Sequence, residues 1–296
     1  MTLSPVFRTP RLVVGTLALA LAALAPGGCT QNPPGPTVVE TAATVPEALN
    51  ATLKPYASYS TLVWNDEFDG SSLNARNWVP EVKDVWYNNE LQATTNSRNN
   101  LAVTNGSLAI TALRETLRGR SYTSARIITK GLRDFTFGRL DVRARLPKGK
   151  GIWPAIWMLG ANDSQVSWPA CGEIDIMELR GSTPQVNIST LHFGNSVATK
   201  PPAQSGTYTL PGGADFSQDY HTFSLVRAQD KMQWFVDGVL YFERTQAQVS
   251  PYPFNNPFYV ILNVAVGGDF DGDPDGTTTF PQQMLVDYVR FYKYAE

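Results

Sequence analysis

Three carboxylates interrupt an apolar run of the chain, Gly172-Glu-Ile-Asp-Ile-Met-Glu-Leu179. The run is of β type. Because side chains alternate between the two faces of a strand, Glu173 and Asp175 share one face while the isoleucines take the other. An ionised carboxylate is too costly to bury in an apolar core without a partner. We therefore expect the acidic face of this strand to line an open cleft.

Glu178 joins this face only if the strand is irregular. It follows Glu173 by five residues, so in a regular strand it points to the opposite side. One extra residue near Ile176 and Met177, a β-bulge, returns it to the acidic face, and bulges are common beside active sites. The two glutamates then lie about 13 Å apart at Cα. Leaning inward across a concave sheet, their carboxyl groups can approach about 5 Å, the separation that retaining glycosidases use.

Asp175 lies between the two glutamates. Neighbouring carboxylates disfavour each other's ionisation, so Asp175 can hold a proton, donate a hydrogen bond to a nucleophile and help to keep Glu178 protonated. Acid and base roles are assigned by such separated pKa values. A solvent-exposed acidic strand and a metal site are the alternatives, although a metal site needs more ligands than this segment offers. We interpret the three acids as a catalytic cluster.

The sequence on both sides of this cluster predicts further strands. Two hairpins turn at Asn105-Gly106 and Asp237-Gly238. Residues 138–146 alternate apolar and polar side chains, and residues 258–266 and 284–292 also have strand character. Long amphipathic helices and internal repeats are not apparent after residue 60. This pattern favours an all-β sandwich or barrel, built as one domain over residues 61–296.

Residues 1–29 are expected to be a signal peptide. Arg8 and Arg11 precede an apolar run over residues 12–24. That run is shorter than the roughly 20 residues needed to span a bilayer and fits a signal h-region.

The segment after the apolar run leaves two forms of export open. Cys29 follows a small residue, as in a lipoprotein cleavage box, although Pro26 departs from the usual Leu; plain secretion with cleavage near Ala25 is the alternative. Residues 30–60 are rich in Pro, Thr and Ala and are interpreted as a linker. The protein is thus expected to be secreted or lipid-anchored, with a membrane tether only through a lipidated Cys29.

Composition narrows the class of protein. The chain has 296 residues, 43% hydrophobic and 17% charged, as in a globular protein. A formal net charge of −2 argues against nucleic-acid binding, which needs a basic surface. Aromatic residues make up 11% of the chain; most are expected in the core, but aromatic faces also stack on sugar rings. Cys171 is expected to be a small buried residue rather than a nucleophile. We expect a monomer.

The motif Glu-Ile-Asp-Ile-Met-Glu resembles the catalytic signature of glycoside hydrolase family 16, in its laminarinase-like branch, where an extra residue such as Met177 precedes the last Glu. The resemblance runs from about Leu62 to Tyr294. Its other segments are Trp64-Asn-Asp-Glu-Phe-Asp69, Asn88-Asn-Glu-Leu-Gln92, Tyr122-Thr-Ser-Ala-Arg126, Gly151-Ile-Trp-Pro-Ala-Ile-Trp-Met158, Asn263-Val-Ala-Val-Gly-Gly268 and Val286-Asp-Tyr-Val-Arg-Phe-Tyr292.

This resemblance implies a concanavalin A-like β-jelly-roll sandwich of two curved antiparallel sheets with a concave glycan-binding cleft. It implies an endo-acting retaining hydrolase of β-1,3-glucan (laminarin-type) or mixed β-1,3/1,4-glucan that needs no cofactor for catalysis. Glu173 is then the nucleophile, Asp175 its assistant and Glu178 the acid/base.

Several further residues are candidates for sugar binding. Trp153 and Trp157 lie four residues apart, so in a strand they share a face; they form either a sugar-stacking wall or part of the core, and the resemblance favours the cleft. Asn263 is polar within an apolar run, so it needs partners there or faces the cleft. His192 is expected either to line the cleft near the leaving-group side or to be structural. By resemblance, Asn88, Asn89 and Arg126 hydrogen-bond sugars on the non-reducing side, with solvated loop positions as the alternative.

Two groups of residues with oxygen ligands are candidates for binding calcium. The alternating acids of residues 269–275 are interpreted as a solvated turn, because Pro274 stands where an EF-hand requires Gly. The resemblance implies instead a structural Ca²⁺ on the convex face, held by Glu67, the backbone carbonyl of Gly106 and Asp287, all oxygen ligands that suit this ion.

Two other functions compete with the glucanase hypothesis. A non-catalytic carbohydrate-binding jelly-roll protein explains the aromatic residues and the export signal, but it has no need for two glutamates flanking an aspartate. The same chemistry on galactan, agar or carrageenan is the other alternative, which the extra residue at Met177 does not exclude.

Overall fold

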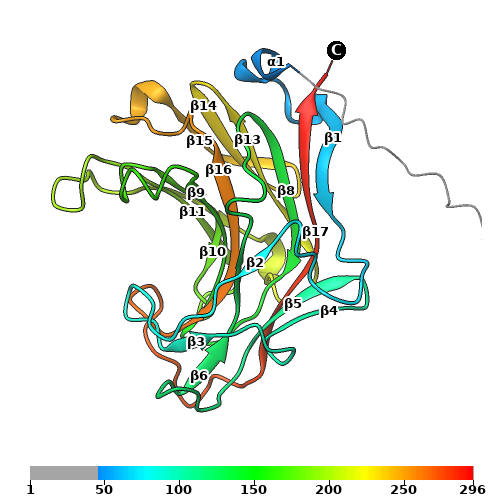
Figure 1. The fold of residues 1–296 in the computed structure, drawn as a ribbon, viewed down its shortest axis with the longest axis vertical. Helices are drawn as coiled ribbons and strands as arrows, with labels where there is room; N and C mark the ends of the chain where they lie inside the picture. The colour runs from blue at the N-terminus through cyan, green and yellow to red at the C-terminus, as the bar shows by residue number, and fades with distance from the viewer. Residues whose placement is uncertain (1–45, 296) are drawn as a thin grey trace, which may run out of the picture. The chain divides into compact units, whose positions relative to one another are not determined.

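The computed structural model describes residues 46–295. The predicted signal peptide, Cys29 and most of the predicted linker lie outside these residues. Two antiparallel sheets dominate the described chain and lie against each other along their length (Figure 1). The prediction of an all-β sandwich of two curved antiparallel sheets is confirmed. Within residues 46–295 there is no helix of the length and apolarity that crossing a membrane requires.

The first sheet has eight strands and is centred on the long C-terminal strand β17. Their order is β15 (Val239–Thr245), β14 (Lys231–Val236), β13 (His221–Ala228), β8 (Gly138–Arg145), β17 (Gln282–Tyr294), β5 (Ser107–Ala112) and β4 (Leu101–Thr104), with β1 (Tyr59–Asp66) also paired with β17. One side of β17 pairs with β8. Its other side pairs first with β5 and then with β1.

The second sheet has seven strands and contains the acidic segment in β10, next to its central strand β9. Their order is β12 (Gln204–Thr209), β11 (Val186–His192), β10 (Glu173–Leu179), β9 (Ile152–Gly160), β16 (Phe258–Val266), β7 (Arg126–Ile128) and β2 (Val79–Pro80). The smaller elements are a parallel pair, β3 (Gln92–Thr94) and β6 (Tyr122–Ser124), the helix α1 (Glu47–Ala51) and the 3₁₀ turns Tyr56–Ser58, Pro211–Gly213 and Gln246–Gln248.

Alternation along the strands places one face of each sheet in the core between them. In β10, Ile174 and Ile176 are buried in this core, on the face opposite to Glu173 and Asp175. Trp234 of β14 is fully buried and donates its indole N–H to the carbonyl of Asp175 across the sandwich. The facing sheet thus supports the acidic strand from behind.

Both predicted hairpins are present. Asn105 and Gly106 have φ values of 53° and 71° between β4 and β5, and Asp237 and Gly238 have φ values of 50° and 78° between β14 and β15. Two successive positive φ angles are typical of the two-residue turn that matches the twist of paired strands, and Asn-Gly and Asp-Gly adopt it at low cost.

The beginning of the described chain packs against the first sheet. Asn50 of α1 is fully buried, donates a hydrogen bond to the carbonyl of Tyr294 and accepts one from its N–H. Residues 30–60 were expected to form a linker, and their lack of a period gave no sign of these contacts.

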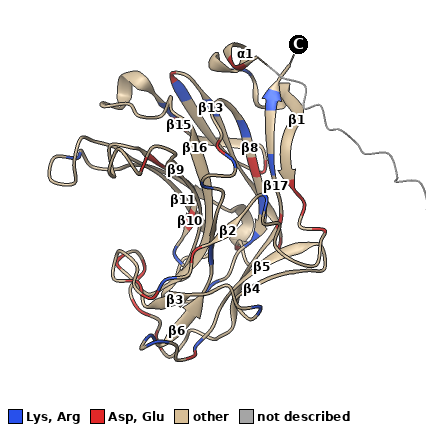
Figure 2. Ribbon diagram, in the orientation of Figure 1, with Lys and Arg blue, Asp and Glu red and all other residues tan. Residues whose placement is uncertain are grey.

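The N-terminal segment of the described chain also packs beside β8 and changes the environment of its charged side chains. Alternation directs Asp141 to the outer face of the strand, yet only 4% of Asp141 is exposed and its carboxylate forms an ion pair with Arg139. The carbonyl of Tyr56 accepts a hydrogen bond from Arg139, whose guanidinium also lies over the Tyr56 ring. Charges of both signs along β8 and β17 are visible in Figure 2.

Candidate active site

A β-bulge in β10 brings Glu178 to the acidic face. Against β11, the three steps from Asp175 to Glu178 match only two, from Thr190 to Ile188. Against β9, the extra residue falls between Asp175 and Met177. Ile176 and Met177 are therefore both buried in the core, which resolves the conflict between a five-residue spacing and a shared face. The irregularity lies where the sequence predicted it.

Strand pairing assembles the other predicted residues on the same face. Directly opposite residues in antiparallel strands share a face, and Asp175 pairs with Trp157. Asn263 of β16 pairs with Ala155, which lies two residues before Trp157 and therefore shares its face. Asn263 also pairs with Arg126 of β7. Glu173 pairs with His192 of β11. Five strands of the second sheet thus present one continuous polar and aromatic face, with β10 near its centre.

Hydrogen bonds hold the two predicted tryptophans of β9. Trp153 donates its indole N–H to Oε1 of Glu178 at 3.0 Å, and Trp157 donates to Oδ1 of Asn263 at 2.7 Å. The Arg126 guanidinium lies over the Trp157 ring, 4.7 Å from its centroid. Both indoles are half-buried rather than part of the core, so their free edges and faces border the acidic strand.

Burial controls the charge of the three acids. It is the main reason why the pKa values of Glu173, Asp175 and Glu178 are all raised. Repulsion from Glu178 raises the pKa of Glu173 and of Asp175 further. Groups this close share their protons as one system. The trio therefore keeps at least one proton near neutral pH, as a site that needs one ionised and one protonated carboxyl group requires.

His192 is neutral in this environment. Burial, followed by the positive charge of Lys200, lowers its pKa to about 4. Its Nε2 lies 3.7 Å from Oε1 of Glu173 and 3.5 Å from Oδ2 of Asp175. The Trp168 ring packs beside it at 5.9 Å between centroids, and Lys200 in turn lies over Trp168. The sequence did not indicate Trp168 or Lys200, because both lie in loops where no strand alternation shows which way a side chain points.

Asn88 and Asn89 lie at the edge of this face and have local structural partners. Both have positive φ angles, which asparagine tolerates better than most residues. The carbonyl of Asn88 accepts a hydrogen bond from the N–H of Asp269, and the side-chain amide of Asn89 donates to the Asp269 carboxylate at 2.8 Å. These bonds join the loop before β3 to the loop after β16. Their proposed contacts with sugar remain a prediction.

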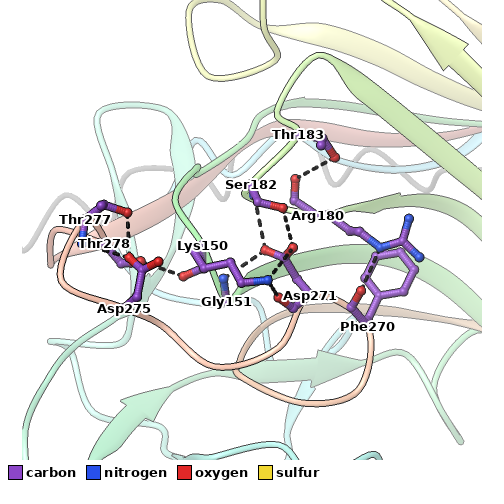
Figure 3. A network of polar contacts seen from close by, with 10 residues as sticks. All are labelled: Lys150, Gly151, Arg180, Ser182, Thr183, Phe270, Asp271, Asp275, Thr277 and Thr278. Atoms are coloured by element: carbon purple, nitrogen blue, oxygen red, sulfur yellow. Dashed lines mark hydrogen bonds and ion pairs between the residues drawn. The ribbon is translucent and has the colours of Figure 1, made fainter.

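Asp271 holds the loop between β16 and β17 in place (Figure 3). The solvated turn expected for residues 269–275 is therefore wrong for Asp271, which is buried. Its side chain is 2% exposed. One carboxylate oxygen accepts hydrogen bonds from the N–H groups of Gly151 and Ser182, at 2.8 and 3.1 Å, and the other accepts from the Ser182 hydroxyl. Lys150 adds an ion pair at 3.6 Å. The spacing of acids along the chain gave no indication that only this one turns inward.

Asp271 thereby positions its neighbour Phe270 against the active site. The Phe270 ring stacks on Trp153 with 4.8 Å between centroids. The Arg180 guanidinium covers Phe270 at 4.3 Å, and its Nε donates to the Phe270 carbonyl at 2.7 Å. Because Trp153 donates to Glu178, this loop supports the indole that contacts the predicted acid.

Strand register places the three residues suggested for calcium near one another beside β17. Pairing of Asp66 with Val289 and of Leu108 with Val286 brings Glu67 and Gly106 near Asp287, where β17 changes partner from β5 to β1. Both carboxylates are engaged by arginine. Arg290 holds both oxygens of Glu67, at 2.9 and 2.8 Å, and lowers its pKa, while Arg143 contacts Asp287 at 2.6 Å. A Ca²⁺ ion fits these ligands only if both guanidinium groups move away.

A jelly roll that lines one face with three carboxylates and half-buried indoles fits a carbohydrate-cleaving enzyme, a glycosidase. Residues 87–290 match the model for glycosyl hydrolases family 16, and the chain belongs to this family. The chain is 40% identical to the beta-glucanase of Rhodothermus marinus over 259 residues, which cover 81% of this chain and 87% of that protein.

Two further relatives support this assignment. Glucan endo-1,3-beta-glucosidase A1 of Niallia circulans is 38% identical over 81% of this chain, but the chain spans only 39% of that longer protein. The laminarinase catalytic domain of Thermotoga maritima MSB8 superimposes with a TM-score of 0.75 and 41% identity, covering 79% of this chain and 98% of that one.

Proposed function

We propose that this protein is an endo-acting, retaining hydrolase of β-1,3-glucan of the laminarin type or of mixed β-1,3/1,4-glucan. The observation that carries this proposal is the bulge in β10, which turns Glu173, Asp175 and Glu178 toward one face bordered by Trp153 and Trp157. Its relatives include a glucan endo-1,3-beta-glucosidase and a laminarinase, which supports β-1,3-glucan as the substrate class.

Glu173 and Glu178 divide the chemistry between them. Glu173 attacks the anomeric carbon while Glu178 gives its proton to the departing glycosidic oxygen, which leaves a covalent glycosyl-enzyme. Glu178, now ionised, then removes a proton from water, and the resulting attack releases the sugar and frees Glu173. No cofactor takes part in these steps.

Asp175 and Trp153 assist the two glutamates. Asp175 is almost fully buried between them, where burial and two negative neighbours raise its pKa. In its protonated form it can donate a hydrogen bond to Glu173 and disperse the nucleophile's charge. The indole N–H of Trp153 holds Glu178 at a fixed angle.

The remaining cleft residues bind the glucan chain. Trp153 and Trp157 offer aromatic surface to sugar rings, and Arg126 and Asn263 are arranged around Trp157 to bond hydroxyl groups. His192 lies beyond Glu173 on β11, at the opposite side of the acidic strand from β9. This order along the sheet supports binding of several sugar units on both sides of the cleaved bond.

Substrate choice is tested by incubating the protein with laminarin, lichenan and agarose and measuring new reducing ends. We expect cleavage of laminarin and absence of cleavage of agarose. Release of intermediate oligosaccharides before glucose identifies endo action. Binding to laminarin without any new reducing ends, at equal protein concentration, favours the carbohydrate-binding alternative, and cleavage of agarose alone favours the galactan-type alternative.

We also propose a structural Ca²⁺ at Glu67, Gly106 and Asp287. The strand register that gathers these residues beside β17 and their oxygen ligands support it. Two arginine ion pairs must open for the ion to bind, so its net contribution to stability is the ion's binding energy less the cost of those pairs. The site lies on the first sheet, away from β10.

The location and the oligomeric state of the protein are also proposed. We infer that the protein is secreted or held at the cell surface by a lipid on Cys29, and that it acts as a monomer. The apolar run before Cys29 supports the export signal. Cell fractionation of the wild type and a Cys29→Ser variant separates the two locations, because only a lipid-anchored protein leaves the membrane fraction on this change. Size-exclusion chromatography with light scattering tests the monomer.

A further inference from the structure

Three potential metal ligands converge beside the acidic strand. Glu173 and Asp175 come from β10, and His192 comes from the end of β11, directly opposite Glu173. One ligand atom from each lies within 4.8 Å of the others. The sequence argued against a metal here because β10 alone offers too few ligands. Strand pairing supplies the third.

The spacing of these atoms fits a small tetrahedral cation. Bonds of about 2.0–2.2 Å to nitrogen and oxygen place neighbouring ligand atoms about 3.3–3.6 Å apart around such an ion. Nε2 of His192 lies 3.7 Å from Oε1 of Glu173 and 3.5 Å from Oδ2 of Asp175. Both distances from His192 are thus close to those of such a site, and all three ligand atoms lie within 4.8 Å of one another. One imidazole and two carboxylates suit Zn²⁺ or Co²⁺ better than Ca²⁺ or Mg²⁺, which prefer oxygen alone.

An unpaired buried oxygen points into the same space. Asp175 is 3% exposed, and its Oδ2, the atom facing His192, has no hydrogen-bond partner among residues 46–295. A buried carboxylate oxygen without a partner is costly and calls for a proton or a cation. Its lack of a hydrogen-bond partner is a separate observation from the spacing of the three ligand atoms, and it indicates the same position.

We propose that a divalent cation of the Zn²⁺ class binds to Glu173, Asp175 and His192, with its fourth position toward the cleft, and blocks the active site. The ion takes the lone pair with which Glu173 attacks, and it occupies space that the sugar ring must enter. The binding rests on this geometry alone, whereas the resulting inhibition of glucan cleavage rests on the proposed function. Zinc and glucan therefore compete for one site.

Binding is measured on the full chain by titration calorimetry with Zn²⁺ and by the visible absorption of Co²⁺, which reports a tetrahedral site directly. We expect one ion per chain and binding at least about tenfold weaker in His192→Gln, given that even indirect supporting partners contribute about 10–100-fold to metal affinity. His221→Gln is the matched control. It changes the only other histidine of the chain, which pairs with Asp237 at 2.7 Å, and leaves the affinity unchanged. Equal zinc affinity in wild type and His192→Gln overturns the proposal.

A second variant covers the case in which His192→Gln does not fold. Asp175→Asn keeps the shape of the side chain but removes its charge, so it is expected to lose the Co²⁺ absorption with a melting temperature near that of wild type. Retained absorption in this variant also overturns the site.

Inhibition is measured separately, with laminarin as substrate. We expect Zn²⁺ to raise the apparent KM with little change in kcat, and a chelator to restore activity. A protein that binds Co²⁺ through His192 but cleaves no glucan keeps the metal site and refutes the proposed function. A protein that cleaves laminarin equally well with and without millimolar Zn²⁺ refutes the blocking ion alone.

Discussion

At the scale of single residues, the chemistry depends on charges held where solvent cannot stabilise them. Glu173, Asp175 and Glu178 have raised pKa values mainly because they are buried. Burial of this kind reduces the stability of the folded state at neutral pH and retains protons for catalysis. The neighbouring Trp153 and His192 each contact one or two of these carboxylates, so small changes at these five positions should alter the reaction more than the fold.

We expect Glu173→Gln to lower kcat on laminarin by more than about a thousandfold, because the amide cannot act as a nucleophile. Burial and the charge of Glu178 raise the pKa of Glu173 on folding. A carboxyl group whose pKa is raised in this way stabilises the protein below its unfolded pKa, and this contribution is lost as pH rises through the raised folded pKa. Removing that group should therefore leave the melting temperature at pH 8 unchanged or higher. A folded variant with near wild-type turnover contradicts the assignment of Glu173.

The pH profile of kcat/KM should be bell-shaped, with an alkaline limb set by the proton on Glu178. Burial raises the pKa of Glu178, and activity falls as pH rises through this raised pKa because the acid is lost. The hydrogen bond from Trp153 lowers this pKa. Trp153→Phe should therefore move the alkaline limb to higher pH. A limb at the same pH in both proteins means that another group controls it.

At the scale of elements, one extra residue in β10 and one inward acid in the loop after β16 determine the site. The bulge lets Ile176 and Met177 both enter the core, so the chain resumes alternation with Glu178 on the cleft face. The loop is fixed by Asp271 and carries Phe270 onto Trp153. Both features connect a local backbone arrangement to the orientation of a predicted catalytic carboxylate.

Cleavage should retain the β configuration at the anomeric carbon. Two glutamates on one bulged strand can converge more closely than the roughly 6.5–9.5 Å that an inverting enzyme needs to fit a water between its second carboxylate and the sugar. Two successive inversions at carbon then give net retention. Proton NMR of freshly released product decides the question. The β-anomer is expected first, followed by mutarotation, and early appearance of the α-anomer rules out double displacement.

Asp271→Ala should lower both stability and kcat/KM. It leaves the buried N–H groups of Gly151 and Ser182 without their acceptor, at a cost of about 1–3 kcal/mol, and releases Phe270 from Trp153. The melting temperature and laminarin kinetics report the two effects. Asp271→Asn keeps one acceptor oxygen and serves as the matched control, with a smaller loss in both. If Asp271→Ala melts lower but cleaves laminarin at the wild-type rate, the loop has no influence on Glu178.

At the scale of the whole molecule, the two sheets have different roles. The second sheet carries the predicted site on its face away from the core, and the first sheet supports it through buried contacts such as that of Trp234 with the backbone of Asp175. The N-terminal segment, through Asn50, covers part of the first sheet and ties the beginning of the described chain to β17. Stability and catalysis should therefore respond separately to changes in the two sheets.

Calcium should raise the melting temperature without changing kcat. An ion bound only by the native state stabilises it by about 2.7 kcal/mol at one hundred times its dissociation constant. Asp287→Asn should abolish the dependence on calcium, even if it also changes the melting temperature in chelator by freeing Arg143. A melting curve that is the same in chelator and in millimolar calcium argues against the site.

The sequence by itself determined the all-β class, the two hairpins and the bulge. Each depends on neighbours in the chain: alternation, an Asn-Gly or Asp-Gly pair, and a five-residue spacing between Glu173 and Glu178. It also supplied the candidate residues of the cleft, partly through resemblance to a family. Roles that depend on contact with the sugar, such as those of Asn88 and Asn89, stayed predictions.

Only the tertiary structure decided which distant residues meet. His192 joins Glu173 and Asp175 because β11 pairs with β10, Asp271 turns inward because Gly151 and Ser182 offer N–H groups there, and Asn50 is buried because β17 ends beside it. A hydrogen bond or a raised pKa depends on the position of groups in space, and residues on different strands or loops leave no periodic trace of such contacts in the sequence. The sandwich fold supplies those positions by strand register.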